Sequence, residues 1–229
     1  MTEQELDRRL QALADEQYRD FSSRLIPGGL PMLGVRLPDL RRLAKEIADG
    51  DYEAFLASDT ERLFETAMLR GMVIGRLRIP TEEKLARMAD FVPRLRDWSV
   101  CDSACSSFRF SPEDRETVFR FVAGYAEKDG EFEQRFCAVM LRAYFLDDEY
   151  ISRTLRLLHV LRHSGYYARM AVAWALCDAF IRQRDKTLAY LESGECDPDI
   201  LRKTVQKCRD SRRVCAADKA LLKGRIGYE

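Results

Sequence analysis

The chain has 229 residues, 46% hydrophobic and 33% charged, with 38 basic side chains balancing 38 acidic ones, a composition that excludes disordered, fibrous and collagen-like proteins. The longest apolar run, Met170–Cys177, has eight residues, far fewer than the roughly 20 that cross a bilayer. The charged N-terminal segment lacks the hydrophobic stretch of a signal peptide, so we expect a soluble, cytoplasmic protein.

The spacing of apolar residues predicts α-helices along nearly the whole chain. The i, i+3, i+4, i+7 pattern of one helix face begins with Leu40–Ile47, behind Pro38, and recurs in Phe64–Gly71 and Tyr167–Ile181. No segment alternates between polar and apolar residues over the length of a strand. Glycine and proline divide the pattern into roughly a dozen helices of about 10 to 18 residues. Among the helix starts, Thr81 and Ser111 stand where N-caps are expected.

Many short helices joined by tight turns favour a stack of helical hairpins over a globin-like cluster or a four-helix bundle. Three pairs of segments have the expected size: 81–92 with 96–107, 112–128 with 131–146, and 148–163 with 166–184. We therefore expect an all-α fold, an α-solenoid that forms a single domain over residues 1–229. Such stacks have a concave face on which extended ligands bind.

Neither metal nor cofactor chemistry is indicated. The seven cysteines are odd in number and form no C-x-x-C motif, so we expect reduced thiols, most of them in the core. His159 and His163 are four residues apart, a spacing that can hold a metal on a helix. However, Val160 stands where the zinc motif HEXXH requires glutamate. We predict structural histidines, no metal site and no cofactor.

The zero net charge hides an asymmetry. Residues 1–150 carry 22 basic and 29 acidic side chains, whereas residues 151–229 carry 16 basic and 9 acidic ones. A basic half commonly faces a polyanion. The alternative, which charge alone leaves equally open, is a solvated helix face that balances the acidic half.

Trp98 and Asp102 are the most informative pair of side chains. On a helix, residues at i and i+4 project from one face about 40° apart. An indole beside a carboxylate offers a flat π-surface and a negative charge to the same guest, and a planar cation would satisfy both. The alternative is a core tryptophan beside an aspartate that caps a helix or forms a local ion pair.

Several segments together resemble one known family. They are, in chain order, Leu33–Lys45 (LGVRLPDLRRLAK), the W-x-x-x-D of Trp98 and Asp102, Gln134–Phe136 (QRF), Tyr166–Trp174 (YYARMAVAW) and Leu201–Lys207 (LRKTVQK). They are similar, in the same order, to motifs of the AlkD-like DNA alkylation repair family, which is built from HEAT-like helical repeats. The resemblance implies a HEAT-like superhelix with duplex DNA in its concave groove.

The resemblance also implies an activity and its residues. The family's enzymes are monofunctional DNA N-glycosylases that excise positively charged N3- or N7-alkylated purines, and Trp98, Asp102 and Arg135 match their active-site set. The alkylated purine is already a good leaving group, so Asp102 would stabilise the oxocarbenium-like transition state and orient water. Trp98 would contact the cationic nucleotide, and Arg135 would anchor a phosphate. The alternative for Arg135 is a side chain that snorkels from an apolar face and pairs with Glu131.

The expected partner is double-stranded DNA with alkylated bases, bound by a monomer that associates with the nucleoid. The candidate DNA-binding residues are Arg169, Trp174, Arg202, Lys203, Lys207, Arg209, Arg212 and Arg213. A core position remains open for Trp174, and surface solvation for the basic residues. Two other functions also remain open: a non-catalytic helical-repeat protein that binds damaged or branched DNA, and a protein-interaction scaffold.

Overall fold

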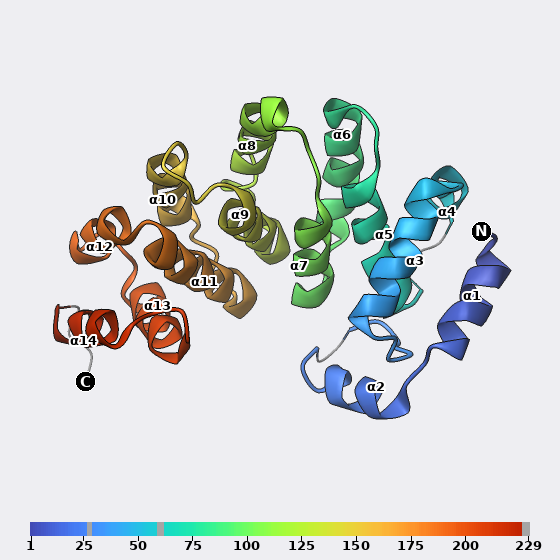
Figure 1. The fold of residues 1–229 in the computed structure, drawn as a ribbon, viewed down its shortest axis with the longest axis horizontal. Helices are drawn as coiled ribbons and strands as arrows, with labels where there is room; N and C mark the ends of the chain where they lie inside the picture. Colours follow the sequence, from blue (N-terminus) through green and yellow to red (C-terminus); the bar gives the residue numbers. More distant parts are fainter. Residues whose placement is uncertain (27–28, 59–61, 226–229) are drawn as a thin grey trace. The chain divides into compact units, whose positions relative to one another are not determined.

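The computed structural model describes residues 1–26, 29–58 and 62–225 (Figure 1). In these ranges the chain forms 14 α-helices and two short 3-10 helices, with no strand, which confirms the all-α prediction. None of the helices within the described ranges is long and apolar enough to cross a membrane.

The chain divides into two compact units, Met1–Val118 and Phe119–Glu229, and the boundary falls within α8. The expectation of a single domain over residues 1–229 stays a prediction. The HEAT-like superhelix and its concave groove also stay predictions.

The first unit is built around helix α5. Its elements are α1 (Glu3–Ala12), α2 (Glu16–Ser23), α3 (Leu37–Asp49), α4 (Tyr52–Ala57), α5 (Phe64–Arg76), α6 (Thr81–Phe91), η1 (Val92–Arg94), α7 (Trp98–Ser107), η2 (Pro112–Asp114) and the start of α8 (Arg115–Ala123). Helix α5 packs against α3 on one side and α7 on the other, and the three lie side by side in Figure 1. Helix α7 carries Trp98 and Asp102, so this packing positions the candidate site.

Helices α5 and α7 approach closely because α5 has glycine at their contact. A Cβ atom on Gly75 would lie 2.9 Å from the backbone nitrogen of Phe108 and from the carbonyl carbon of Ser107. A Cβ on Gly71 would lie 2.6 Å from the Cβ of Ala104 on α7. Real Cβ contacts are longer, so only glycine fits without a shift of α7.

A buried glutamate holds the segment that precedes α3. Glu65 is fully buried, and its Oε1 accepts hydrogen bonds from the backbone N–H groups of Leu33, Gly34 and Val35 at 3.0, 2.8 and 3.2 Å. Gly34 has φ of +85°, the left-handed region that favours glycine, and its Cα faces the backbone of Arg19. The carboxylate thus fixes the LGV segment that the sequence analysis singled out.

The second unit is built around α11. It contains the end of α8 and α9 (Glu131–Tyr144), α10 (Ile151–Val160), α11 (Tyr166–Arg182), α12 (Arg184–Glu192), α13 (Pro198–Asp210) and α14 (Ala216–Arg225). Helix α11 packs against α9 and α13, while α10 and α12 also contact it (Figure 1). The helix bounds lie close to those that the breaker positions predict.

The buried face of α11 differs from the face that the sequence indicates. In the predicted stripe Cys177 is buried but Tyr167, Met170 and Trp174 are only half-buried, whereas Ala168 and Leu176 on the opposite side are buried. Small alanine side chains let α9 and α13 pack closely against this helix, and the side that carries Trp174 is left at the surface of the unit.

Of the two predicted caps, Ser111 occupies the N-cap position of η2 but makes no side-chain cap hydrogen bond, and the prediction for Thr81 is wrong. Helix α6 begins at Thr81 itself, and its hydroxyl donates a hydrogen bond to Oδ2 of Asp114 at 2.6 Å. The Ser111 hydroxyl donates to the same oxygen at 3.0 Å. Both hydroxyl groups therefore serve one carboxylate instead of a helix N-terminus. They hold the pKa of Asp114 below its ordinary value, the Thr81 bond being the larger cause.

The prediction for the cysteines is confirmed. Six of the seven free thiols are buried and Cys215 is exposed. The pKa of the Cys137 thiol is raised because it is buried.

Candidate functional site

The α7 helix begins at Trp98 and is capped by the residue before it. Oδ1 of Asp97 accepts hydrogen bonds from the backbone N–H groups of Ser99 and Val100, both at 2.9 Å. Asp97 therefore has the capping role that the alternative interpretation gave to Asp102. Because Asp102 lies one turn further along, its carboxylate and the Trp98 indole project from the same face of α7.

Trp98 and Asp102 are both half-buried. The indole Nε1 of Trp98 donates a hydrogen bond to the carbonyl oxygen of Leu25, 3.1 Å away. This bond fixes the ring against the segment after α2, so the ring is held in place without being enclosed in the core. A π-face and a carboxylate presented together can bind a planar cation.

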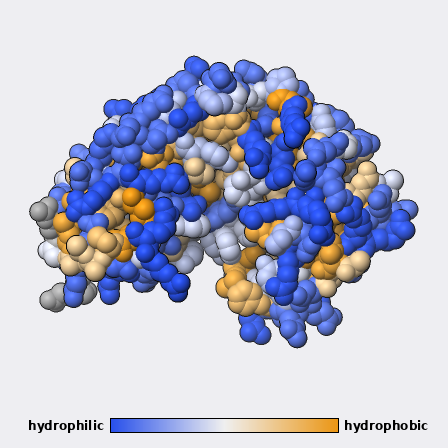
Figure 2. All heavy atoms as spheres, in the orientation of Figure 1, coloured by the Kyte–Doolittle hydropathy of each residue, from blue (hydrophilic) through white to orange (hydrophobic). Residues whose placement is uncertain are grey.

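An apolar cavity of about 100 Å³ lies beside the indole. Trp98, Phe21, Leu25 and Met68 contribute to its walls. Phe21 and Leu25 are 60% and 50% exposed, so α2 and the residues after it present apolar side chains to solvent next to Trp98. Figure 2 shows such apolar patches between the hydrophilic residues that cover most of the visible surface.

Arg135 lies in the second unit, on α9, and is 4% exposed. Its Nη1 donates a hydrogen bond to the carbonyl oxygen of Tyr167 at 2.8 Å. Glu131 accepts hydrogen bonds from the backbone N–H groups of Tyr167 and Ala168, at 2.5 and 3.4 Å, and so caps the start of α11. The guanidinium is thus held within the unit, which corrects the alternative interpretation of a side chain that snorkels to solvent.

Trp174 is half-buried on α11 and has cations against its ring. The Cζ atom of Arg142, on α9, lies 3.6 Å from the ring centroid, and the Nζ atom of Lys207, on α13, lies 5.8 Å from it. Arg142 Nε also donates to Oδ2 of Asp178 at 2.7 Å. The structure therefore places Trp174 in a cluster of charged side chains at the surface of the unit.

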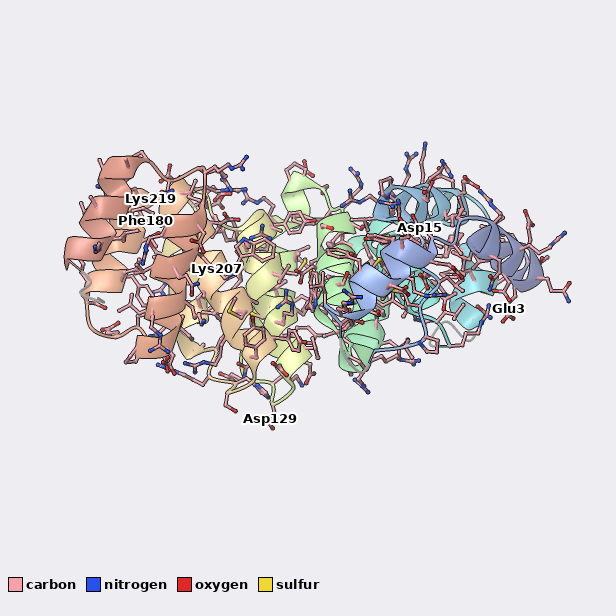
Figure 3. All side chains as sticks on the ribbon, turned by 90° about the horizontal axis from the view of Figure 1, so that it is seen from below. Glu3, Asp15, Asp129, Phe180, Lys207 and Lys219 are labelled. Carbon is pink, nitrogen blue, oxygen red and sulfur yellow. The ribbon has the colours of Figure 1, made fainter. Side chains whose placement is uncertain are left out.

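The basic candidates fall into two groups. Arg169 pairs with Asp197 at 2.6 Å and with Asp199 at 3.3 Å, and Arg202 pairs with Asp199 at 2.6 Å. Arg213 pairs with Asp178 at 3.0 Å. By contrast, four candidates have no carboxylate within ion-pair distance among the residues that the structure describes. They are Lys203, Lys207, Arg209 and Arg212, all on α13 or in the turn after it (Figure 3 labels Lys207).

Lys207 is the most perturbed of these basic groups. Burial lowers its pKa most. The nearby positive charges of Arg135 and Lys203 lower it further, whereas Cys177 and, more weakly, Asp210 act in the opposite direction. Cations that crowd one another in a half-buried place are stabilised by an anion that binds there.

No cluster of histidine, cysteine and acidic side chains within the described residues could hold a metal ion. His163 Nδ1 accepts a hydrogen bond from the backbone N–H of Gly165 at 2.8 Å, and His159 lies against the ring of Tyr190. Both histidines thus have structural contacts.

The sequence analysis missed Arg142 and Asp178, which complete the cluster at Trp174. A signal for them was present: Trp174 and Asp178 repeat the W-x-x-x-D spacing of Trp98 and Asp102. Arg142 lies seven residues after Arg135, on the same face of α9.

One protein-family model matches nearly the whole chain. The model of the family described as DNA alkylation repair enzyme matches residues 6–210. A comparison with curated proteins finds no match.

Proposed function

The chain belongs to the DNA alkylation repair enzyme family, and we propose that it is a monofunctional DNA N-glycosylase. Its substrate is duplex DNA that carries a positively charged N3- or N7-alkylated purine, and the product is the free alkylated base. Trp98, Asp102 and Arg135 carry out the reaction without metal or cofactor.

The observation that carries the proposal is the pair of Trp98 and Asp102 on one face of α7. The second unit contains a similar pair, and its contacts show what such a pair binds. At the same spacing on α11, Trp174 and Asp178 hold the guanidinium of Arg142, which stacks on the indole and pairs with the carboxylate. An indole and an aspartate at i and i+4 thus bind a planar cation, and an alkylated purine is another planar cation.

The chemistry follows from where charge develops. Alkylation at N3 or N7 makes the purine a good leaving group, so the base needs no proton from the enzyme. As the glycosidic bond lengthens, positive charge builds on the deoxyribose. The carboxylate of Asp102 stabilises that charge and orients the water that attacks the sugar. Trp98 contacts the cationic nucleotide, and the positive charge of Arg135, whose guanidinium is held by its bond to Tyr167, attracts a phosphate of the damaged strand.

Binding of the duplex is assigned to the basic residues of the second unit. Lys203, Lys207, Arg209 and Arg212 contact phosphates, since their charges are not neutralised by nearby carboxylates within the described part of the chain. Phosphate contacts of this kind give affinity that falls steeply with salt.

The experiment that tests the proposal is release of 7-methylguanine from alkylated duplex by Asp102→Asn. Loss of the carboxylate is expected to slow release by about tenfold or more, with little change in duplex affinity. Asp49→Asn is the matched control, because Asp49 is exposed at the end of α3 in the same unit, and it should release base as the unaltered protein does.

Equal release by Asp102→Asn and the unaltered protein would remove Asp102 from the mechanism. Duplex binding without release of base from any alkylated substrate would instead favour the non-catalytic DNA-binding function.

A further inference from the structure

A buried carboxylate and an indole hold the basic groups of the second unit in place. Asp178, on α11, has a side chain that is only 9% exposed. Its Oδ2 accepts the hydrogen bond from Arg142 at 2.7 Å, and its Oδ1 accepts one from Nη1 of Arg213 at 3.0 Å. A single carboxylate therefore fixes two guanidinium groups that come from different parts of the chain.

The bond to Arg213 also fixes the turn between α13 and α14. The Ser211 hydroxyl accepts a hydrogen bond from the backbone N–H of Arg213 at 3.1 Å, and Val214 is buried. The side chain of Arg213 is 54% exposed although its Nη1 is held by Asp178. Since a guanidinium has five N–H donors, the remaining donors can reach a phosphate while the Asp178 bond stays in place.

The Trp174 ring holds the side chains of Arg142 and Lys207 in place, as Asp178 holds the side chain of Arg213. Arg142 lies 3.6 Å from the ring centroid and its side chain is 24% exposed. Lys207 Nζ lies 5.8 Å from the same centroid. A ring that already has a guanidinium stacked on it is a poor platform for a nucleobase, because the base would have to displace Arg142.

We propose that Trp174 and Asp178 are positioning residues for a preorganised phosphate site, in which Arg213 and Lys207 contact adjacent phosphates of the DNA backbone and Arg142 supports them. The inference rests on the proposed function only in taking duplex DNA as the ligand. It replaces direct contact between Trp174 and DNA with an indirect role. It also adds two residues, Arg142 and Asp178, to the DNA-binding face.

A simpler role for Asp178 makes the opposite prediction. If this carboxylate only neutralised positive charge, its removal would raise the positive charge of the unit and strengthen binding to DNA. If it positions Arg213 and Arg142, its removal weakens binding even though the protein becomes more positive. The sign of the effect therefore separates the two roles.

The test is the affinity of Asp178→Asn for a short undamaged duplex, measured by fluorescence anisotropy over a series of salt concentrations. We expect binding weaker by about fivefold, and a slope of log affinity against log salt that is smaller by about one, as for the loss of one phosphate contact. Asp178→Glu, which keeps the charge, should recover part of the affinity. Asp185→Asn is the matched control, because this aspartate pairs with Arg184 but is 90% exposed, and it should not weaken binding.

Combined variants keep the test informative if Asp178→Asn changes the fold. Trp174→Leu should weaken binding in the unaltered protein but have little further effect once Arg142→Ala and Lys207→Ala are both present, because Trp174 acts through these two cations. Trp174→Phe, which keeps an aromatic face, should bind more tightly than Trp174→Leu. If Trp174→Leu still multiplies the loss in the Arg142→Ala/Lys207→Ala protein, Trp174 contacts DNA directly, and this result would overturn the inference.

The outcomes also separate this inference from the proposed function. Unchanged or tighter binding by Asp178→Asn, with base release by the unaltered protein, would overturn the inference and leave the glycosylase intact. Weaker binding by Asp178→Asn with no base release from any alkylated duplex would support the inference and remove the glycosylase activity.

Discussion

The buried carboxylate of Glu65 gives a quantitative test of how the first unit is held together. Replacing it with alanine leaves three backbone N–H groups, those of residues 33–35, without their acceptor. Two of these hydrogen bonds are buried and the third is partly buried. A buried donor that loses its partner costs about 1 to 3 kcal/mol, so the three together would cost about 3 to 9 kcal/mol.

One cost of the native arrangement offsets part of this loss. Oε2 of Glu65 is buried without a hydrogen-bond partner among the described residues, and burying a polar oxygen in this way is itself unfavourable. We therefore expect Glu65→Ala to lower the free energy of unfolding by about 3 kcal/mol, a large share of the roughly 5 to 15 kcal/mol that stabilises a domain. Glu65→Gln keeps an acceptor oxygen but loses its charge, and should cost about 1 kcal/mol.

Urea unfolding followed by circular dichroism at the helical minimum measures these differences. Glu82→Ala is the control, because Glu82 is exposed on α6 of the same unit, and it should change stability by less than about 0.5 kcal/mol. If the free energy of unfolding of Glu65→Ala lies within about 1 kcal/mol of that of the unaltered protein, these three hydrogen bonds do not stabilise the unit as we propose.

Three further predictions follow from packing and charge. Gly75→Ala should destabilise the protein by about 1 to 3 kcal/mol despite the better helix propensity of alanine. Gly224→Ala is the control and should not destabilise it, because nothing lies within 4 Å of the added Cβ. Urea unfolding measures both changes in stability. The pKa of Lys207 lies below its ordinary value, so duplex affinity should fall as pH rises through that lowered pKa, and Lys207→Arg should abolish this fall in a titration from about pH 7 to pH 10. The lowered pKa of Asp114 means that its stabilisation is present above the unfolded pKa and is lost as pH falls through the folded pKa. Removal of the donor hydroxyl in Thr81→Val should therefore weaken the acid dependence of stability, and the same loss at low pH in both proteins would contradict this.

The sequence predicted the helices well because their signals are local. The stripe of Leu40 and Ile47 on α3 is buried as its spacing indicates, and Pro38 stands at the start of that helix. The prediction failed where tertiary contacts decide. Thr81 resembles a cap, yet its hydroxyl bonds to Asp114, 33 residues away in the chain.

The same limit applies to the candidate site. Trp98 and Asp102 could be placed on one helix face from their spacing alone, but the bond from the indole to Leu25 spans 73 residues and leaves no trace in the sequence. Helical periodicity left a core position open for Trp174, because the pattern does not reveal which side of a helix small alanines will bury. Only the fold brings Arg142 onto that ring.

The most direct measurement of the central claim is the appearance of free methylated purine when the purified protein acts on alkylated duplex in the presence of a chelator. The account predicts that 7-methylguanine or 3-methyladenine accumulates with time and with protein concentration, and that chelator does not slow the release. An alkylated duplex that is bound but keeps all of its methylated bases would contradict it.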